Sequence, residues 1–331
     1  MVPISSPVDL SRFWLVSALA IAVYVGALGT VVRWVVRWRA ARRAADVPAV
    51  EPGAGRGRRR VFRILESINL GLAGLGIVAA AYAYYEPYRP EVIWVRIPTA
   101  KLPEGSSPIR IVQLSDIHSD DDARLEDDLP EIVASLRPDA IVFTGDAVNQ
   151  DGGLVHFRRL MRALAAIAPT FAVRGNWDVW WFSHLRFFAG TGVRDLDGEA
   201  VPLAVRSVRV WFVGAPVEGH DLLWPVLGEV PPDELSIVLH HYPEVGARAL
   251  ELGADLALAG DTHGGQVRLP PLGPLIRISR FGAYNDAGLH RIGSGLLCVN
   301  RGIGMEGGWV PRVRFGCRPE ITVVEIVPEA G

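Results

Sequence analysis

The sequence predicts an α/β domain of layered sheet and helices that follows a membrane anchor of two transmembrane helices. Two observations lead to this prediction. From residue 108 onward, short apolar runs alternate with amphipathic stretches, which is typical of buried strands covered by helices. Before residue 86, two long uncharged runs flank a segment that holds ten arginines. We therefore divide the 331 residues into an anchor (1–86), a linker (87–107) and an α/β domain (108–327).

Composition and charge exclude several classes of protein. Half of the residues are apolar and 21% are charged, which excludes long disordered regions. The net charge is −2 and the ten arginines gather at 33–63, away from the α/β domain, so we expect no nucleic-acid partner. Cys298 and Cys317 have no CxxC or Cys/His spacing, which excludes a zinc finger and a disulfide scaffold.

The anchor begins with an uncharged run of 20 residues at 13–32, which is long enough as a helix to cross a hydrocarbon layer of about 30 Å. A cleaved signal peptide is the alternative for this run, but its arginines follow the apolar stretch instead of preceding it. The second predicted span, at about 64–85, contains Asn69 and ends in a tyrosine cluster suited to a membrane interface. It is the weaker span of the two.

The arginines of the anchor predict its orientation, because cytoplasmic loops collect Lys and Arg. The Arg-rich loop between the spans should be cytoplasmic, where it can also bind anionic lipid headgroups. With two spans, the protein is a multi-pass membrane protein whose N-terminus and α/β domain lie outside the cytoplasm. If the second run does not span, the α/β domain lies inside.

Within the α/β domain, the residue patterns predict six strands and three helices. The strands are short, apolar and often β-branched, and the helix at 154–166 repeats apolar residues at helical spacing. The predicted strands are 109–114, 140–143, 170–173, 208–213, 236–239 and 256–259, and the predicted helices are 125–136, 154–166 and 245–252.

Side chains of the kinds that bind metal ions follow five of these strands. Ligands in α/β proteins bind at the carboxyl ends of the strands, so we expect these side chains to converge at one edge of the sheet. Oxygen and nitrogen ligands without thiolate suit Mn, Fe or Zn. In chain order the side chains are Asp116 and His118, then Asp146, then Asn176 and Asp178, then His240 and His241, and finally Asp261 and His263.

In their order along the chain, these motifs resemble those of the calcineurin-like metallophosphoesterase family, whose pattern is D-x-H, G-D, G-N-H-D/E, a later His, and G-H-x-H. The resemblance covers about residues 108–326. It implies two facing mixed β-sheets flanked by helices and two divalent metal ions. It implies that Asp116, His118 and His263 bind one metal ion, that Asp146 bridges both, and that Asn176 and His241 bind the second.

The family's later histidine stands before a residue and a proline, which selects His241 in the stretch His241-Tyr242-Pro243. Neighbouring side chains of a strand face opposite ways, so His240 is then a residue of the core or a support for the ligands. Two cations about 3.5–4 Å apart can clamp a phosphoryl group and activate a water for in-line attack. The resemblance therefore implies phosphoester hydrolysis.

Asp261 departs from the family, because it stands where the family has the first histidine of G-H-x-H. A carboxylate is still a competent ligand and favours harder metal ions, so we expect Asp261 to bind the second ion. The alternative is that it points away and leaves that ion weakly held.

Trp177 is the second departure from the family pattern, because it stands where the family has the histidine of G-N-H-D/E. In the family this histidine is thought to protonate the leaving group. An indole donates only its N–H and does not titrate, so it cannot act as a general acid. A phosphate leaving group needs no such proton near neutral pH, which predicts a preference for pyrophosphate bonds or activated esters over alkyl phosphates. His184, Asp178 or His240 could replace the missing acid, and our predicted catalytic set is Asn176, Asp178 and His184.

An aromatic cluster, Trp180-Trp181-Phe182 with Phe187-Phe188, follows shortly after the candidate ligands. If it is packed in the core, the cluster is part of the hydrophobic interior and has no role in binding. Exposed beside a membrane-tethered site, it would suit acyl or prenyl chains. The anchor favours the second interpretation and a lipid-linked substrate.

The stretches at 300–304 and 314–320 are similar to those of membrane-anchored bacterial phosphoesterases, some of which hydrolyse UDP-diacylglucosamine in lipid A synthesis. We therefore expect a dimetal phosphoesterase or pyrophosphatase of the bacterial inner membrane, with a lipid-linked or cell-envelope substrate. UDP-diacylglucosamine agrees with the leaving-group argument but conflicts with a domain outside the cytoplasm, because UDP-sugars are cytoplasmic. The alternative is a catalytically degenerate phosphoesterase-fold protein that acts as a membrane-bound binding or scaffold protein.

Overall fold

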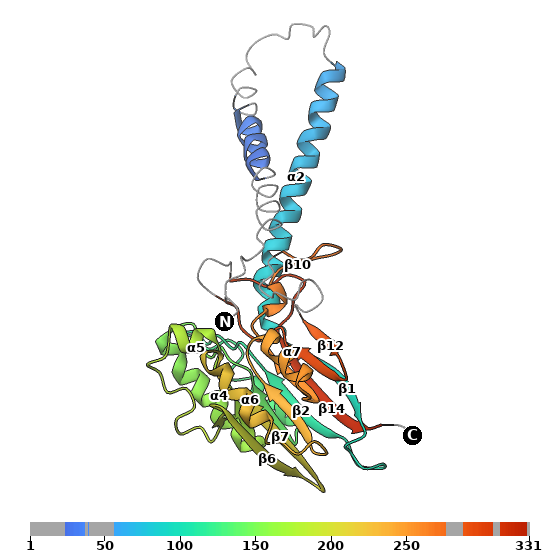
Figure 1. The fold of residues 1–331 in the computed structure, drawn as a ribbon. Coiled ribbons are helices and arrows are strands. Elements are labelled where there is room, and N and C mark those ends of the chain that lie inside the picture. The colour runs from blue at the N-terminus through green and yellow to red at the C-terminus, as the bar shows by residue number, and fades with distance from the viewer. Residues whose placement is uncertain (1–23, 37–38, 40–55, 276–286, 307–311, 330–331) are drawn as a thin grey trace, which may run out of the picture. The chain divides into compact units, whose positions relative to one another are not determined.

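The computed structural model describes residues 24–36, 39, 56–275, 287–306 and 312–329 (Figure 1). These residues divide into two compact units, with the boundary between Tyr84 and Tyr85. The first unit is helical, and the second contains all the strands.

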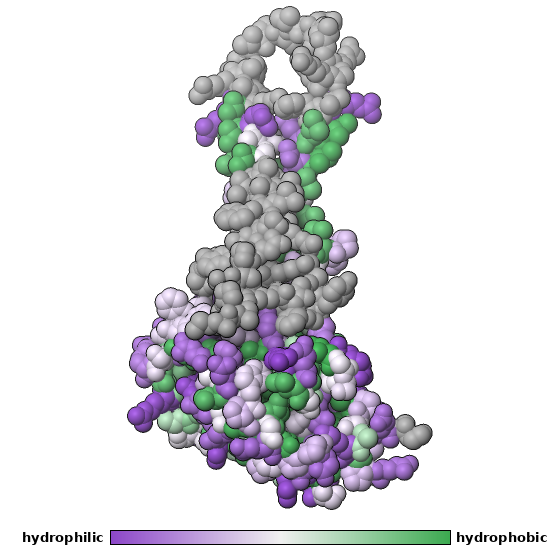
Figure 2. Space-filling model, viewed as in Figure 1, coloured by the Kyte–Doolittle hydropathy of each residue, from purple (hydrophilic) through white to green (hydrophobic). Residues whose placement is uncertain are grey.

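The helical unit consists of a helix at Tyr24–Val36 and helix α2 (Arg56–Tyr85). The helical stretch Arg63–Tyr88 is long and apolar enough to cross a membrane, and it is the one such stretch among the described residues. Its most apolar window of 18 residues is not buried in the structure. Figure 2 shows apolar side chains exposed along these helices. Asn69, the polar residue of this span, lies against Gly26 of the other helix. Much of the predicted first span, 13–23, lies outside the described residues.

The second unit contains two mixed six-stranded sheets, together with a two-stranded ribbon of β10 (Arg268–Leu269) and β11 (Gly273–Pro274). In the first sheet, the strand order is β1 (Glu91–Thr99), β14 (Glu320–Pro328), β2 (Ile109–Leu114), β3 (Ala140–Phe143), β4 (Thr170–Ala172) and β5 (Arg194–Asp195). In the second sheet, it is β12 (Gly288–Ile292), β13 (Gly295–Val299), β9 (Leu256–Ala259), β8 (Leu235–Leu239), β7 (Val208–Gly214) and β6 (Glu199–Val205).

Side chains of both sheets meet in one apolar core, which shows that the sheets face each other. Phe171 of β4 and Phe212 of β7 stack with ring centroids 4.3 Å apart. Strand β2 has side chains buried on both faces, since Ile111 lies in this core and Val112 in a second cluster under the helices. The predicted fold of two facing mixed sheets flanked by helices is therefore confirmed.

The helices cover the outer faces of the two sheets. Helices α3 (Leu129–Ser135) and α4 (Leu154–Ile167) pack on the first sheet through apolar residues such as Val133 and Phe157. Helices α6 (Leu223–Leu227) and α7 (Pro243–Glu251) pack on the second sheet. The short helix α5 (Asn176–Trp180) follows β4 at the edge of the first sheet.

The segment 87–107, predicted from the sequence to be a linker, contains strand β1 of the first sheet, so that prediction is corrected. β1 pairs in parallel with β14 over its whole length. Val95 and Ile97 face the core, whereas Trp94 is 52% exposed, as expected of a strand at the edge of a sheet. A half-exposed strand whose partner lies more than 200 residues away has only a weak local signal.

The strand pairing of the first sheet shows at which edge of the sheet strand β1 begins. Glu91, the first residue of β1, pairs with Glu320, the first residue of β14. β14 runs antiparallel to β2, which is parallel to β3 and β4. The start of β1 therefore lies at the same edge as the carboxyl ends of β2, β3 and β4.

Candidate metal centre

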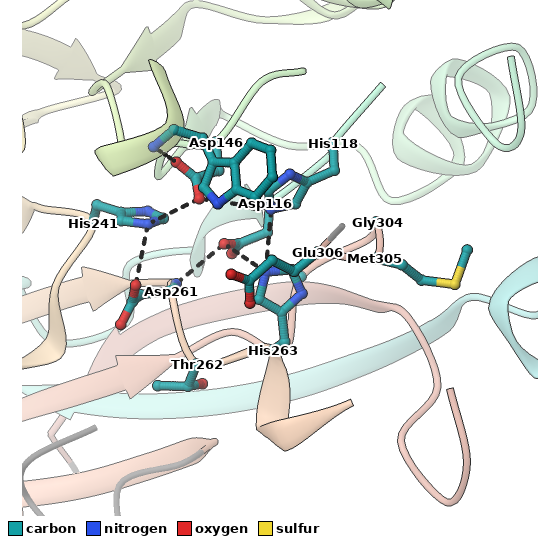
Figure 3. Close-up of polar contacts among 12 residues, drawn as sticks. Asp116, His118, Asp146, His241, Asp261, Thr262, His263, Gly304, Met305 and Glu306 are labelled. Carbon is teal, nitrogen blue, oxygen red and sulfur yellow. Dashed lines mark hydrogen bonds and ion pairs between the residues drawn. The ribbon is translucent and has the colours of Figure 1, made fainter. Parts of the chain in front are cut away.

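The loops that follow β2, β3, β4, β8 and β9 bring the predicted ligands together at one edge of the two sheets (Figure 3). The ligand atoms form two groups in which every pair of atoms lies within 4.8 Å. The first group is Asp116, His118 and His263, and the second is Asp116, Asp146 and His241.

In the first group, Nε2 of His118 lies 3.2 Å from Nε2 of His263, which lies 3.4 Å from Oδ1 of Asp116. The other ring nitrogen of His118, Nδ1, lies 2.8 Å from Oδ1 of Asn149. Because an amide oxygen only accepts hydrogen bonds, this contact places the proton on Nδ1 and leaves the lone pair of Nε2 facing the group. Burial lowers the pKa of His118 to about 4, which keeps the ring neutral.

In the second group, Nε2 of His241 lies 2.9 Å from Oδ1 of Asn176 and 3.4 Å from Oδ2 of Asp146. Nδ1 of His241 lies 2.7 Å from the carbonyl oxygen of Thr144, so Nδ1 donates and Nε2 faces the carboxylates. Asp261 lies beside this group, with Oδ1 3.5 Å from Nε2 of His241. Figure 3 shows the Asp261 side chain pointing into the site.

Asp146 lies between the two groups. Its Oδ2 is 3.6 Å from Nε2 of His118 and 3.4 Å from Nε2 of His241. Asp116 also belongs to both groups, and its Oδ1 accepts the main-chain N–H of Asp261 at 3.2 Å. The resemblance implies a shared role for Asp146, and in the structure Asp116 as well as Asp146 lies close to side chains of both groups.

Five of the candidate ligands have backbone conformations that only glycine adopts without strain. Their φ angles are positive, and such a conformation costs about 1–2 kcal/mol for each residue with a side chain. Strain of this kind gathers at functional sites, where the surrounding structure maintains it. The residues are Asp116 (49°), His118 (46°), Asp146 (62°), Asp261 (71°) and His263 (51°).

Two glycines allow the loops to approach this closely. A Cβ on Gly145, whose φ is +101°, would lie 2.6 Å from Nδ1 of His241. A Cβ on Gly175 would lie 2.1 Å from Oδ1 of Asp146. Side chains at these positions would displace the groups that form the site.

The electrostatics of the site fit a pair of divalent cations. Burial raises the pKa of Asp116 to about 7 and raises that of Asp261 well above its usual range. Burial also acts to raise the pKa of Asp146, but the neighbouring His241 and His118 lower it overall. Within the described residues, Oδ2 of Asp116 and Nδ1 of His263 are buried without a hydrogen-bond partner.

Burial keeps the imidazoles of His118 and His263 neutral by lowering their pKa. Burial acts to lower the pKa of His241 too, but the carboxylates around it raise that pKa well above its usual value, so a cation would take the place of its proton. Buried carboxylates, imidazoles and unpaired ligand atoms together suit a dinuclear metal site.

The predicted catalytic residues have different surroundings. Asn176 faces the second group, as described above. Asp178 is buried and its carboxylate accepts the main-chain N–H groups of Asp146, Ala147 and Gly175, so it fixes the loop after β3. His184 is exposed and pairs with Asp151, outside both groups. This geometry gives no support to Asp178 or His184 as the replacement acid.

Two residues beside the site, Asn149 and Glu306, belong to no motif that the sequence reveals. Asn149, which orients His118, comes three residues after Asp146. Glu306 points into the site (Figure 3), and the indole of Trp177 donates a hydrogen bond to its carboxyl group. Burial and the charges of Asp146 and Asp116 raise the pKa of Glu306 to about 7.

Comparison with known proteins agrees with this geometry. A family model described as calcineurin-like phosphoesterase matches residues 109–265. The chain is 32% identical to the uncharacterized metallophosphoesterase YkuE of Bacillus subtilis (strain 168) over 72% of this chain and 86% of that one. It is 30% identical to the phosphodiesterase YaeI of Escherichia coli (strain K12), over 82% of this chain and 99% of that one. It is 28% identical to a transmembrane protein with metallophosphoesterase domain of Bos taurus, over 70% of this chain and 56% of that one.

The fold and these relatives thus define a metal-dependent hydrolase, and its two groups of ligand atoms suit a dinuclear centre. The chain belongs to the calcineurin-like phosphoesterase family.

Proposed function

We propose that this protein is a membrane-anchored dimetal phosphoesterase that hydrolyses a phosphate ester or pyrophosphate bond in a lipid-linked or cell-envelope compound. The arginines of the anchor favour a multi-pass protein of the bacterial inner membrane with its α/β domain outside the cytoplasm. With that orientation, the substrate is a carrier-lipid diphosphate or a wall polymer. With the opposite orientation, it is a UDP-diacylglucosamine-type diphosphate.

The observation that best supports a membrane-bound substrate is the place where the chain enters the domain. Glu86, which directly follows helix α2, is buried and accepts the main-chain N–H of Cys317 at 3.2 Å. The thiol of Cys317 in turn donates to the carbonyl oxygen of His263 at 3.2 Å. Two hydrogen bonds therefore join Glu86, the residue that directly follows helix α2, to the loop of a candidate ligand, which supports a substrate held in the membrane that α2 would span.

The chain's own residues have two tasks in this proposal. Asp116, His118 and His263 would hold one cation, and Asn176, His241 and Asp261 would hold the other, with Asp146 available to both. Asn149 and Thr144 fix the imidazole rings so that their lone pairs face the cations. When bound, the two cations would activate a water and neutralise the phosphoryl oxygens.

Trp177 indicates which kind of phosphate bond the protein hydrolyses. Its main-chain N–H donates to Oδ1 of Asp146 at 2.9 Å, and its ring meets that of His118 edge-on with centroids 5.2 Å apart. The family's titratable histidine is thus replaced, at the site itself, by a ring that cannot protonate a leaving group. A leaving group that is itself a phosphate departs without that proton, which supports a diphosphate substrate.

The names of two relatives agree with parts of this proposal. YaeI is named a phosphodiesterase, which supports an ester of phosphate as the substrate class. The Bos taurus relative is named a transmembrane protein, which supports the anchor.

The function is tested with the full-length chain in detergent, by measuring its metal content and its turnover of a lipid diphosphate and of an alkyl phosphate monoester. We expect two divalent ions for each chain and faster hydrolysis of the diphosphate. Asp146→Asn should lose metal and nearly all activity, whereas Asp151→Asn, at an exposed carboxylate, should retain both. An inactive wild type that still binds the lipid diphosphate would favour the binding or scaffold alternative.

The orientation is tested separately in intact cells. Cys298 and Cys317 are buried, so they are poor targets for labelling. Leu252→Cys introduces a thiol at a position that is 49% exposed. A membrane-impermeant maleimide should label this thiol from outside, and labelling only after lysis would place the domain in the cytoplasm.

A further inference from the structure

We propose that Arg314 is a positioning residue of the metal centre, whose buried guanidinium group holds two loops in the conformation that presents Asp116 and His263 to one cation. This inference rests on the proposed dimetal function and adds to it a residue behind the ligands. The stretches 300–304 and 314–320, which stand out in the sequence, contain Arg314 and the carbonyl groups that it contacts.

The guanidinium group of Arg314 is surrounded by main-chain carbonyl groups. Its Nε donates to the carbonyl oxygen of Gly304 at 2.9 Å. Its Nη2 donates to that of Arg301 at 2.9 Å and to that of Gly302 at 3.1 Å. Its Nη1 donates to that of Cys317 at 3.2 Å. The side chain of Arg314 has no exposed surface, and within the described residues no carboxylate pairs with it.

These contacts require an arginine. The planar guanidinium group presents five N–H donors in a fixed fork, so one side chain can satisfy several carbonyl groups that converge on it. Burying a charge without an ion of opposite sign costs free energy, and a side chain that only filled this space could be apolar. The carbonyl groups gathered around Arg314 therefore indicate that it fixes the loops to which they belong.

The first of these loops, 300–304, lies directly against Asp116. The main-chain N–H of Gly304 donates to the carbonyl oxygen of Asp116 at 2.6 Å. A Cβ on Gly302 would lie 2.7 Å from Cβ of Asp116, so no space separates the loop from the ligand. The φ angle of Asp116 is 49°, a strained conformation that persists only where the surrounding structure maintains it. The loop that Arg314 holds supplies part of that support.

The second loop connects Arg314 to His263. Cys317, whose carbonyl oxygen accepts from Arg314, donates through its thiol to the carbonyl oxygen of His263 at 3.2 Å. His263 also has a positive φ angle, 51°. Asp116 and His263 both belong to the first group of ligand atoms. Because these contacts converge on the first group, losing Arg314 should weaken the first cation more than the second.

The test measures Mn²⁺ binding by the full-length chain in detergent, after removal of divalent ions, for the wild type, Arg314→Met and Arg314→Lys. Electron paramagnetic resonance separates a spin-coupled pair of Mn²⁺ ions from a single ion. In both variants the affinity for one ion should fall about 10- to 100-fold, the usual effect of losing a group that orients a ligand, and the affinity for the other should change less. Lysine keeps the charge but not the fork of donors, so it should not rescue binding.

Two variants of helix α7 serve as matched controls. Leu250→Ala removes a buried apolar side chain, so it should lower Tm while both Mn²⁺ affinities stay at the wild-type values. Arg248→Met makes the same chemical change as Arg314→Met at an exposed arginine and should alter neither quantity. If Arg314→Met does not fold, Arg314→Lys and Cys317→Ala decide the question. Cys317→Ala removes only the thiol hydrogen bond to His263 and should weaken the same ion.

Wild-type Mn²⁺ affinities in Arg314→Met would overturn the proposal, and so would an equal fall for both ions. Wild-type affinities in Arg314→Lys would show that charge alone suffices and would overturn the role of the hydrogen bonds. If Leu250→Ala weakens binding as much as Arg314→Met does, the effect comes from lost stability and the proposal is wrong. A wild type that binds two Mn²⁺ ions but hydrolyses no phosphate compound would overturn the proposed function alone, whereas a wild type that binds no Mn²⁺ would overturn both.

Discussion

Replacing Asp178 with Asn should weaken both the fold and the metal site, because the carboxylate of Asp178 accepts three main-chain N–H groups. Oδ2 accepts from Asp146 at 2.9 Å and from Gly175 at 2.8 Å, and Oδ1 accepts from Ala147 at 2.8 Å. An amide keeps one acceptor oxygen, so at least one buried donor must face an NH₂ group. An unsatisfied buried donor costs about 1–3 kcal/mol of the free energy of unfolding.

For a domain of this size, such a loss lowers Tm by about 2–12 °C, which thermal unfolding of the full chain in detergent can measure. The substitution also loosens the loop that positions Asp146. Metal affinity should therefore fall about 10- to 100-fold, the usual result of removing a group that orients a ligand. Asp151→Asn makes the same chemical change at an exposed carboxylate and should alter neither quantity.

If Asp178→Asn retains the Tm and the metal affinity of the wild type, the three hydrogen bonds do not support the loop and the reasoning is refuted. A lower Tm with unchanged metal affinity would confine the role of Asp178 to the fold.

The remaining predictions concern the ligands and the leaving group. The pKa of Asp116, raised to about 7, means that the cation-free protein keeps this proton up to about pH 7, and a cation must displace it. Metal affinity, measured by calorimetry, should therefore rise about tenfold per pH unit below pH 7 for this proton. Because the pKa of His241 is also raised well above its usual value, the affinity should go on rising above pH 7, and a flat profile would contradict this. Asp261→Ala should lower the metal content toward one ion for each chain, whereas Asp261→His should restore it; an unchanged content in the first variant would count against a ligand role. Trp177→His should speed hydrolysis of an alkyl phosphate monoester about 10²-fold with little change for a diphosphate, and equal monoester rates before and after would exclude the leaving-group argument. Gly145→Ala should cost about 1–3 kcal/mol of stability, measured by denaturation, because its φ is +101° and its Cβ would meet His241; wild-type stability would show that the loop can adjust.

The central strands of the domain could be predicted from sequence because each is apolar, short and followed by a polar turn. The prediction of 109–114, for example, coincides with β2. The convergence of the ligand side chains also followed from the sequence, because ligands that come after parallel strands share one edge. The edge strand β1 was missed because its partner, β14, lies at the other end of the chain.

The supporting residues of the site could not be found in the same way. Asn149 and Glu306 act through where their side chains point, and no spacing in the sequence encodes that direction. The direction of the Asp178 side chain could not be predicted either, because a carboxylate next to the site can face the substrate or accept hydrogen bonds from the main chain. In the structure its oxygens accept three main-chain N–H groups.

The parallel pairing of β1 with β14 has a consequence for how the protein is made. β14 lies between β1 and β2, so the strand nearest the anchor has no neighbour in the sheet until residues 320–328 have left the ribosome. The first sheet is therefore completed last, and a chain that stops before residue 320 would have an unfinished sheet. Under the anchoring proposed above, such a chain would already be inserted in the bilayer through its N-terminal helices.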